Sequence, residues 1–290
     1  MSRHHWMAPV FIAPIVLLLL VFVAYPVFHN FWVSFHEMGL FGQEAKFVGL
    51  RNFIELSSDS RFLHALTIDV IWTIATVGLQ LIVGTVAALV LHRHFFGRGL
   101  ARSLVLIPYL TPPVIVAVMW RWMLHGSLGI VNHVLRSLNI ISVPIAFLGT
   151  PTLALVSLIL IGVWQWSPFV TISVLARLQT IPPELPEAAR IDGANPWQAF
   201  LHVTLPQLRS VFFVIILLRG VWMFNKFDLP WALTGGGPAR STEILPVLAY
   251  LKTFSQGQVG MGTAINVICF VLLGLLALVY FYVYDVEEEM

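Results

Sequence analysis

Six long runs of apolar residues divide this chain, and more polar stretches separate them. A helix of about 20 mainly apolar residues crosses the hydrocarbon core of a bilayer. The runs are too continuous for the alternating strands of an outer-membrane barrel, so a backbone that satisfies its own hydrogen bonds in lipid must be helical. The pattern predicts an all-α integral membrane protein, a single membrane domain over residues 1–290 with six transmembrane helices. The expected spans are 8–28, 65–91, 103–124, 153–175, 211–231 and 261–284.

The expected orientation rests on basic residues near the ends of the spans. The short loop between the second and third runs carries Arg93, Arg98 and Arg102. Short loops rich in Lys and Arg face the cytoplasm. Six spans return the chain to its starting side, so both termini are expected to be cytoplasmic. The first run is too long for a signal peptide and no small-residue cleavage site follows it, so we expect it to be retained.

The composition is typical of membrane proteins, and it restricts the kinds of partner that we expect. Hydrophobic residues make up 58% of the chain and charged residues 10%, against about 25% charged residues in soluble domains. The formal net charge is +2 and the basic residues are scattered, which disfavours nucleic acid as a partner and leaves membrane lipid as the surroundings. Cys269 is the only cysteine, so no internal disulfide is expected.

Two of the predicted spans contain residues that predict a local feature, a bend in one helix and a packing face on the other. In the third, Pro108, Pro112 and Pro113 each remove a backbone donor and disfavour helix before them. A bent or interrupted helix is predicted, either as a structural kink or beside a transport pathway. In the second span a residue suited to packing recurs every four positions, at Gln80, Gly84 and Ala88. These residues make one face of the helix that permits close contact with another helix.

A polar segment, residues 184–206, separates the fourth and fifth spans. Its acidic start favours a short helix that ends at Gly193. Asn195 is then placed as an N-cap, with Gln198 three residues later, and Pro206 is expected to close this second helix. The segment is predicted to be a helix, tight turn and helix at the cytoplasmic surface. Composition alone leaves a merely solvated helical loop as an equal alternative.

The stretch "EAARIDGANPWQAFLHVTLP" resembles the cytoplasmic signature of binding-protein-dependent ABC importer permeases. That signature is Glu-Ala-Ala, three residues, Gly, nine residues, an aliphatic residue, one residue and Leu-Pro. The matching positions here are Glu187, Ala188, Ala189, Gly193, Val203, Leu205 and Pro206.

Other family-like features extend the resemblance over nearly the whole chain. They are Tyr25-Pro26, "FVGLRNF" at 47–53, "WRW" at 120–122 and "LTGGGP" at 233–238. The second and the last resemble the carbohydrate-uptake branch, of the maltose or glycerol-phosphate type. The order of these motifs along six spans is more specific than any one of them.

The resemblance implies a permease subunit that translocates a sugar or sugar derivative across the bacterial inner membrane. It implies a cytoplasmic ABC ATPase dimer, a second homologous permease and a periplasmic or extracellular substrate-binding protein as partners. ATP and Mg are then expected on the ATPase, with no cofactor on this chain. Segment 184–206 is implied to be the coupling helix that docks on the ATPase, through Glu187, Ala188, Ala189, Asp192, Gly193, Leu205 and Pro206.

No catalytic or metal-binding constellation is found in the sequence. The stretch "GGGPARST" lacks the Gly-Lys-Ser/Thr core of a phosphate loop, and no HExxH or GxSxG motif occurs. His4-His5 and the pair His92 and His94 lack Cys or carboxylate partners. The chain is therefore expected not to be an enzyme. The alternative is an ion-coupled secondary transporter, which is expected to show internal repeats and mid-membrane carboxylates, whereas spans 153–175 and 261–284 carry no charge.

Ionisable residues in the fifth span are candidates for a substrate pathway, because such residues in membranes face cavities or partners. At 100° per residue, Arg219, Trp222 and Lys226 fall in a sector about 60° wide. Sugars stack on aromatic rings and hydrogen-bond to polar side chains. These positions are equally compatible with a structural role, either an ion pair of Arg219 or Lys226 with Asp228 or Asp69, or snorkelling of the long side chains near the outer end of the span. The candidate pathway residues are Arg219, Trp222, Asn225, Lys226, Asp228, Trp164 and Trp166, of which the last two are equally suited to packing.

The outer loop, residues 233–258, begins with a glycine turn. Ile244, Leu248 and Leu251 then follow at helical spacing, which predicts a short amphipathic helix lying at the outer surface.

Overall fold

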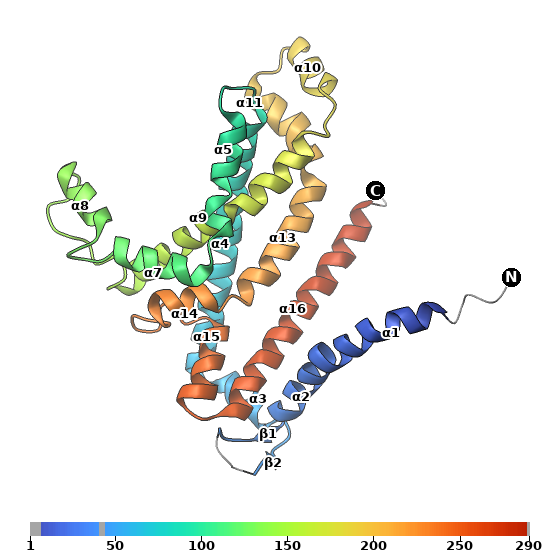
Figure 1. The fold of residues 1–290 in the computed structure, drawn as a ribbon, viewed down its shortest axis with the longest axis vertical. Coiled ribbons are helices and arrows are strands. Elements are labelled where there is room, and N and C mark those ends of the chain that lie inside the picture. The colour runs from blue at the N-terminus through green and yellow to red at the C-terminus, as the bar shows by residue number, and fades with distance from the viewer. Residues whose placement is uncertain (1–6, 41–43, 289–290) are drawn as a thin grey trace. The chain divides into compact units, whose positions relative to one another are not determined.

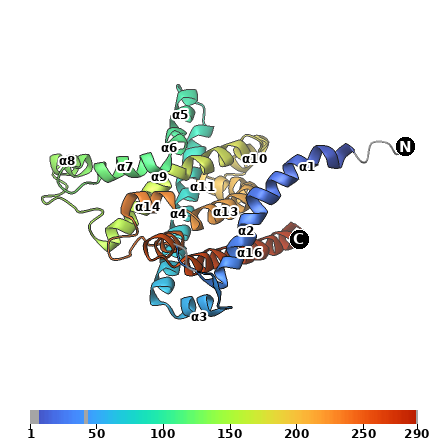
Figure 2. The same cartoon turned by 60° about the horizontal axis from the view of Figure 1, so that its bottom comes forward.

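The computed structural model describes residues 7–40 and 44–288. The chain falls into two compact units, which are described separately. Unit 1 contains residues 1–63 and 248–274, and unit 2 contains residues 64–247 and 275–290. The fold is mostly helical, as predicted, with one short two-stranded sheet in the described part of the chain. Figures 1 and 2 show the order of the elements.

The elements of unit 1 are α1 (Met7–Leu19), the π-helical turn η1 (Leu20–Ala24), α2 (Tyr25–Ser34), β1 (His36–Glu37), β2 (Lys46–Phe47), α3 (Arg51–Ser58) and η3 (Leu251–Ser255). Three helices belong in part to each unit, namely α4 (Ser60–His92), α15 (Leu245–Tyr250) and α16 (Val259–Glu288).

The elements confined to unit 2 are α5 (Arg98–Val105), α6 (Ile107–Leu110), α7 (Pro113–Met123), α8 (Ile130–Ser137), α9 (Pro151–Leu178), α10 (Glu184–Ile191), α11 (Pro196–Ala199), η2 (Phe200–Thr204), α12 (Leu205–Gln207), α13 (Arg209–Phe224) and α14 (Asp228–Thr234). Figure 2 shows α8 set apart from α4, α9 and α13.

Four helical segments are long and apolar enough to cross a membrane, and two bent helix pairs raise the number to six if each pair is one span. The four are Phe11–Ser34, Ser60–His92, Pro151–Leu178 and Val259–Tyr282. The bent pairs are Arg98–Leu110 with Pro113–Met123, at 94°, and Pro196–Gln207 with Arg209–Phe224, at 65°. Each of the six predicted runs therefore overlaps an apolar helical segment.

The predicted break in the third span lies at Thr111 and Pro112, between α6 and α7. The carbonyl group of Thr111 accepts a hydrogen bond of 3.2 Å from the side-chain amide of Gln165 on α9. A neighbouring helix thus satisfies a backbone group freed by the break, which is the condition for such breaks in lipid.

The packing face predicted on α4 is confirmed. A Cβ atom on Gly84 would lie 2.6 Å from the Cβ of Val170 on α9, so only glycine permits this approach. Ala88 is buried in a core cluster with Val170 and Val174. Small residues here bring the two longest helices of unit 2 into direct contact.

The fifth span differs from the prediction, because helix α13 ends at Phe224 and the chain starts a new helix, α14, at Asp228. Pro230 supplies the physical reason. In a continuous helix it would remove a hydrogen bond and clash with the preceding turn, whereas in the first turn of a new helix its missing N–H is not needed. Helix α14 packs against α7 and α9.

The outer loop also differs from the prediction, because its helix α15 does not lie on the surface. Ile244 and Leu248 are fully buried. In unit 2 the glycine turn folds back on itself, with Gly236 at a φ of +91° and the hydroxyl groups of Thr234 and Thr242 2.6 Å apart. Asp69 of α4 accepts a 3.2 Å hydrogen bond from the backbone N–H of Leu245. These contacts, which join residues distant in sequence, turn the apolar face inward.

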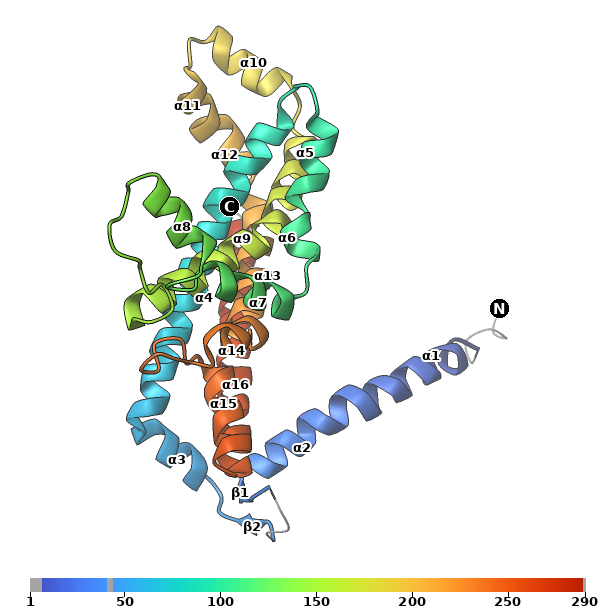
Figure 3. The same cartoon turned by 60° about the vertical axis from the view of Figure 1, so that its left-hand side comes forward.

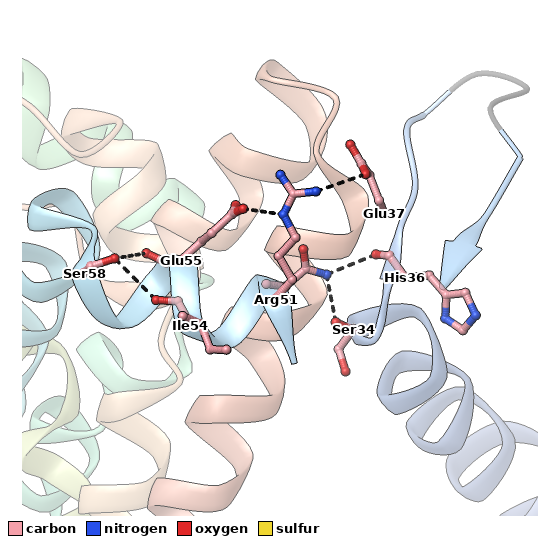
Figure 4. A network of polar contacts seen from close by, with 8 residues as sticks. Ser34, His36, Glu37, Arg51, Ile54, Glu55 and Ser58 are labelled. Carbon is pink, nitrogen blue, oxygen red and sulfur yellow. Dashed lines mark hydrogen bonds and ion pairs between the residues drawn. The ribbon is translucent and has the colours of Figure 1, made fainter. Parts of the chain in front are cut away.

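In unit 1 a polar network holds the segment 47–53 (Figure 4). The side-chain amide of Asn52 donates to the carbonyl groups of Ser34, at 2.8 Å, and His36, at 3.0 Å. Arg51 contacts Glu55 at 2.7 Å and Glu37 at 3.9 Å. The family-like motif therefore has a structural role in tying α3 to the end of α2 and to β1.

Candidate functional site

The polar segment between the fourth and fifth spans folds as two helices joined by a tight turn. Helix α10 begins with two acidic residues in its first turn and ends before Gly193, whose φ is +86°. The N–H of Gly193 donates to the carbonyl of Arg190, and the N–H of Ala194 donates to that of Ala189. These two bonds make a Schellman motif, which satisfies carbonyl groups at the helix end.

The second helix begins with the predicted capping box. The N–H of Gln198 donates to Oδ1 of Asn195, and the N–H of Asn195 donates to Oε1 of Gln198, each at 2.9 Å. The helix does not close at Pro206 as predicted. It continues through the π-helical turn η2 into α12 and bends by 65° before α13. Pro206 is the second residue of α12, directly after the π-helical turn η2.

We use the name coupling element, after the role expected from the sequence, for residues 184–207, from the start of α10 to the end of α12. Its predicted contact residues are distributed over an open surface, since Glu187, Ala188 and Asp192 are exposed. Apolar side chains accompany them, with Ile191 87% exposed and Trp197 66% exposed. Large exposed apolar side chains beside small ones mark a surface suited to a protein partner. Among the other predicted contact residues, Gly193 and Pro206 are exposed, while Ala189 and Leu205 are half-buried.

The coupling element is anchored to the helices of unit 2. Arg177, in the last turn of α9, donates from Nε to the carbonyl of Gln207 at 2.9 Å. Leu208 directly follows the element and is fully buried in the core cluster with Leu178 and Ile215. Figures 1 and 3 place α10 and α11 at the end of unit 2 where α4 turns into α5, away from α14. The end of the element is therefore attached both to α9 and to the start of α13.

The second candidate site is an aromatic cluster around Arg219, which is only 2% exposed. Its guanidinium carbon lies 5.6–5.8 Å from the ring centres of Trp166, Phe169 and Trp222. Its Nε donates to Oε1 of Gln80 at 2.9 Å. Ring faces and a neutral amide thus surround this cation, and cation–π contacts of this kind stabilise a desolvated cation.

Lys226 joins the same cluster from outside helix α13. Its Nζ lies 4.8 Å from the ring centre of Trp166 and 3.1 Å from Oδ2 of Asp228. The ion-pair alternative is therefore correct for Lys226 with Asp228. It is wrong for Arg219, whose side chain donates hydrogen bonds to Gln80 and to the sulfur of Met223. The structure brings together Arg219, Trp222, Lys226, Asp228 and Trp166.

The remaining pathway candidates are Trp164, which lies apart from the cluster, and Asn225, which ends α13 three residues after Trp222. Trp164 is two residues before Trp166 on α9, so the two side chains point about 200° apart. Trp164 packs edge-on against Trp120, with ring centres 5.6 Å apart. Asn225 is the exposed C-cap residue of α13.

Sequence analysis missed two members of this cluster. Gln80 was interpreted only as part of a packing face, although it is the hydrogen-bond partner of Arg219. Phe169, which also stacks with Tyr109, lies in an apolar run that gives no signal for a special role. The spacing Trp166 to Phe169 is three residues, which places both rings on one face of α9.

This chain is similar to several known proteins over most of its length. Residues 80–286 match the family described as "Binding-protein-dependent transport system inner membrane component". The trehalose/maltose transport system permease protein MalF of Thermococcus litoralis is 38% identical over 269 residues, covering 93% of this chain and 90% of the relative. The inner membrane ABC transporter permease protein YcjO of Escherichia coli is 35% identical over 264 residues, 90% and 88% of the two chains.

A further relative is the sulfoquinovosyl glycerol transport system permease protein SmoG of Agrobacterium fabrum, 33% identical over 267 residues, covering 92% and 86% of the two chains. Among solved structures, a bacterial ABC transporter involved in import of the acidic polysaccharide alginate contains a chain with a TM-score of 0.82 at 21% identity, covering 96% of this chain and 94% of that one. This structural likeness shows a shared fold.

Proposed function

Because the chain belongs to the family of binding-protein-dependent transport system inner membrane components, we propose that it is the permease subunit of an ATP-driven sugar importer. The relatives with named cargo transport trehalose and maltose or sulfoquinovosyl glycerol. The chain supplies the membrane path, and separate ATPase subunits hydrolyse ATP. In this proposal the membrane is a bacterial inner membrane, and both termini are cytoplasmic.

The observation that carries this proposal is the anchored coupling element. Its two helices are capped internally, its outer face carries exposed small and apolar residues, and Arg177 fastens its end to α9. A short element of this kind moves as a body. ATP binding draws two ATPase subunits together, and their closure displaces the element and the helices attached to it.

Transport then requires two states of the membrane helices with different affinities for the partners. ATP binding must favour the outward-open state over the inward-open state, because a ligand that binds both states equally shifts nothing. A binding protein delivers the sugar from outside. In support, one solved structure of the alginate transporter is a complex with a periplasmic protein that carries an alginate pentasaccharide.

We place the sugar path along the exposed edge of the aromatic cluster. Trp222 is 44% exposed, and Asn225 next to it is exposed, so a ring and an amide are available to one sugar. Arg219 stays beneath the rings, where it positions Trp166 and Trp222 by cation–π contact.

Trp222→Ala is expected to lower sugar uptake while complex assembly is retained.

The charges at the cluster favour a neutral sugar. Lys226 is paired with Asp228 and Arg219 is buried, so neither offers an unpaired cation to an anionic cargo. Competition assays test this directly. A neutral disaccharide is expected to compete for uptake, and a sulfonated or uronic-acid sugar is not; competition by acidic sugars alone would reverse the assignment.

The function itself is tested in vesicles that contain the purified transporter with its co-purified subunits and an added binding protein. Uptake of labelled sugar should require ATP and should persist when ionophores remove ion gradients. Uptake that needs an ion gradient and ignores ATP would replace this proposal with an ion-coupled secondary transporter.

A further inference from the structure

A groove of about 1140 Å³ lies within unit 2, between α4, α13 and the coupling element. It exceeds the roughly 300–1,000 Å³ of pockets for drug-sized ligands. One wall is a single face of α4, which contributes residues from Leu81 to Arg93. The opposite wall includes Phe212 and Ile216 of α13. The aromatic cluster and the proposed sugar path do not line it.

The length of the groove matches one leaflet of a bilayer. From Leu81 to Arg93 a helix rises about 18 Å, at about 1.5 Å per residue. Half of a hydrocarbon core about 30 Å thick is about 15 Å. The span Ser60–His92 ends at the same point, so the groove runs from mid-membrane to the surface where lipid phosphates lie.

Charge is confined to the surface end of the groove. Along α4 the lining side chains from Leu81 to Leu89 are apolar except for Thr85, and His92 and Arg93 follow. The coupling element adds Arg190 and Glu187 to the lining. Two arginines and one glutamate leave a net positive mouth, and arginine is well suited to bind phosphate by paired hydrogen bonds.

We propose that this groove binds an anionic phospholipid of the inner leaflet. One acyl chain lies along α4 beside Ile82 and Val86, and the phosphate meets Arg93 and Arg190. Basic pockets at the membrane surface recognise lipid headgroups in this way. The lipid bridges α4 and the coupling element, so its presence stiffens the part of the chain that receives the force from the ATPase.

A transmembrane helix of a partner subunit fits the groove less well. Such a helix needs about 20 apolar residues to cross both leaflets, whereas the α4 wall of the groove extends over 13 residues, from Leu81 to Arg93. A lipid also explains why the cations gather at one end only. Lipid binding requires only that the chain is embedded in a membrane, whereas the stiffening effect rests on the proposed function.

The test is native mass spectrometry of the purified full chain with phosphatidylglycerol or phosphatidylcholine added. Phosphatidylglycerol is expected to be retained in preference. Arg93→Ala and Arg190→Ala should each weaken its binding about fivefold, since one basic residue near a membrane contributes about 1 kcal/mol. The matched control is Arg98→Ala, on the same side but outside the groove lining, which should leave binding unchanged.

A second variant tests separately whether the groove binds the acyl chain of the lipid. Val86→Trp, at an exposed position of α4, fills the groove and should reduce retention of both lipids with the cations intact. Inorganic phosphate at millimolar concentration should not displace the lipid. Equal retention of both lipids in all variants, displacement by phosphate, or loss of the lipid when partner subunits assemble would each overturn the proposal.

Discussion

At the scale of single residues, the least ordinary feature is a buried cation with neutral partners. Burying a charge is costly unless it is hydrogen-bonded or otherwise compensated. Arg219 is compensated by Gln80 and by three aromatic rings. The charge of Arg219 is therefore compensated without a carboxylate in the membrane. The same contacts fix the orientation of the rings that we assign to the sugar path.

Replacement of Gln80 by methionine tests this compensation. The two side chains have similar shapes, but methionine removes the oxygen that accepts from Arg219. A hydrogen bond to a charged group contributes about 1.5–3 kcal/mol, so Gln80→Met should lower the melting temperature of the purified protein. Gln179→Met, at an exposed position, is the control. An unchanged melting temperature would show that the rings alone hold Arg219.

In unit 1, Asp59 provides a pH-dependent contribution to stability. Burial tends to raise the pKa of its carboxyl group, but the backbone N–H of Arg61, 2.8 Å away, and the ammonium group of Lys252, 3.3 Å away, outweigh burial and lower that pKa. The native pKa therefore lies below the unfolded value of about 3.9. The stabilisation is complete above that value and is lost as the pH falls through the native pKa.

Asp59→Asn should therefore melt at a lower temperature than the wild type near neutral pH. The difference should shrink as the pH falls below about 3.9. A difference that stays constant with pH, or that grows in acid, would contradict the ion pair. Melting curves of both proteins across this range provide the measurement.

At the scale of elements, the turn between α10 and α11 depends on one backbone conformation. A side chain on Gly193 would meet nothing within 4 Å, so only its φ of +86° opposes substitution. Gly193→Ala should cost about 1–2 kcal/mol of local stability and weaken ATP hydrolysis coupled to transport. Asparagine tolerates this region, so Gly193→Asn should retain more activity than Gly193→Ala. Equal loss in both variants would show that bulk at the interface, not backbone strain, is responsible.

Local structure was predictable from the sequence where its causes are local. The turn at Gly193 and the capping box of Asn195 and Gln198 follow from residues three or four positions apart, and both are confirmed. The bend at Pro112 is confirmed for the same reason.

Structure that depends on distant residues was not predictable in this way. Pro230 explains locally why α13 does not continue as one helix, but the packing of α14 on α7 and α9 depends on residues far along the chain. Burial of Ile244 and the pairing of Arg219 with Gln80 likewise need partners far along the chain. Periodicity identified Arg219 and Trp222 as candidates, but it placed Lys226 on a helical face that does not exist.

At the scale of the whole molecule, the account assigns different tasks to different parts of the chain. In unit 2 we propose that the coupling element receives force from the ATPase and that the aromatic cluster contacts the cargo; Arg177 of α9 contacts the first region, and α9 and α13 contribute Trp166 and Trp222 to the second. In this proposal, the connection through α9 and α13 lets ATP binding on the partner subunits alter the cargo path.

The most direct test of the central claim is photo-cross-linking from Ile191 in intact cells that express the whole transporter. A cross-linking amino acid at this exposed position should capture the ATPase subunit. The same amino acid at Leu128, exposed in the loop after α7, should not capture it. Absence of the ATPase among products from Ile191, or equal capture from both positions, would contradict the assignment of residues 184–207 as the coupling element.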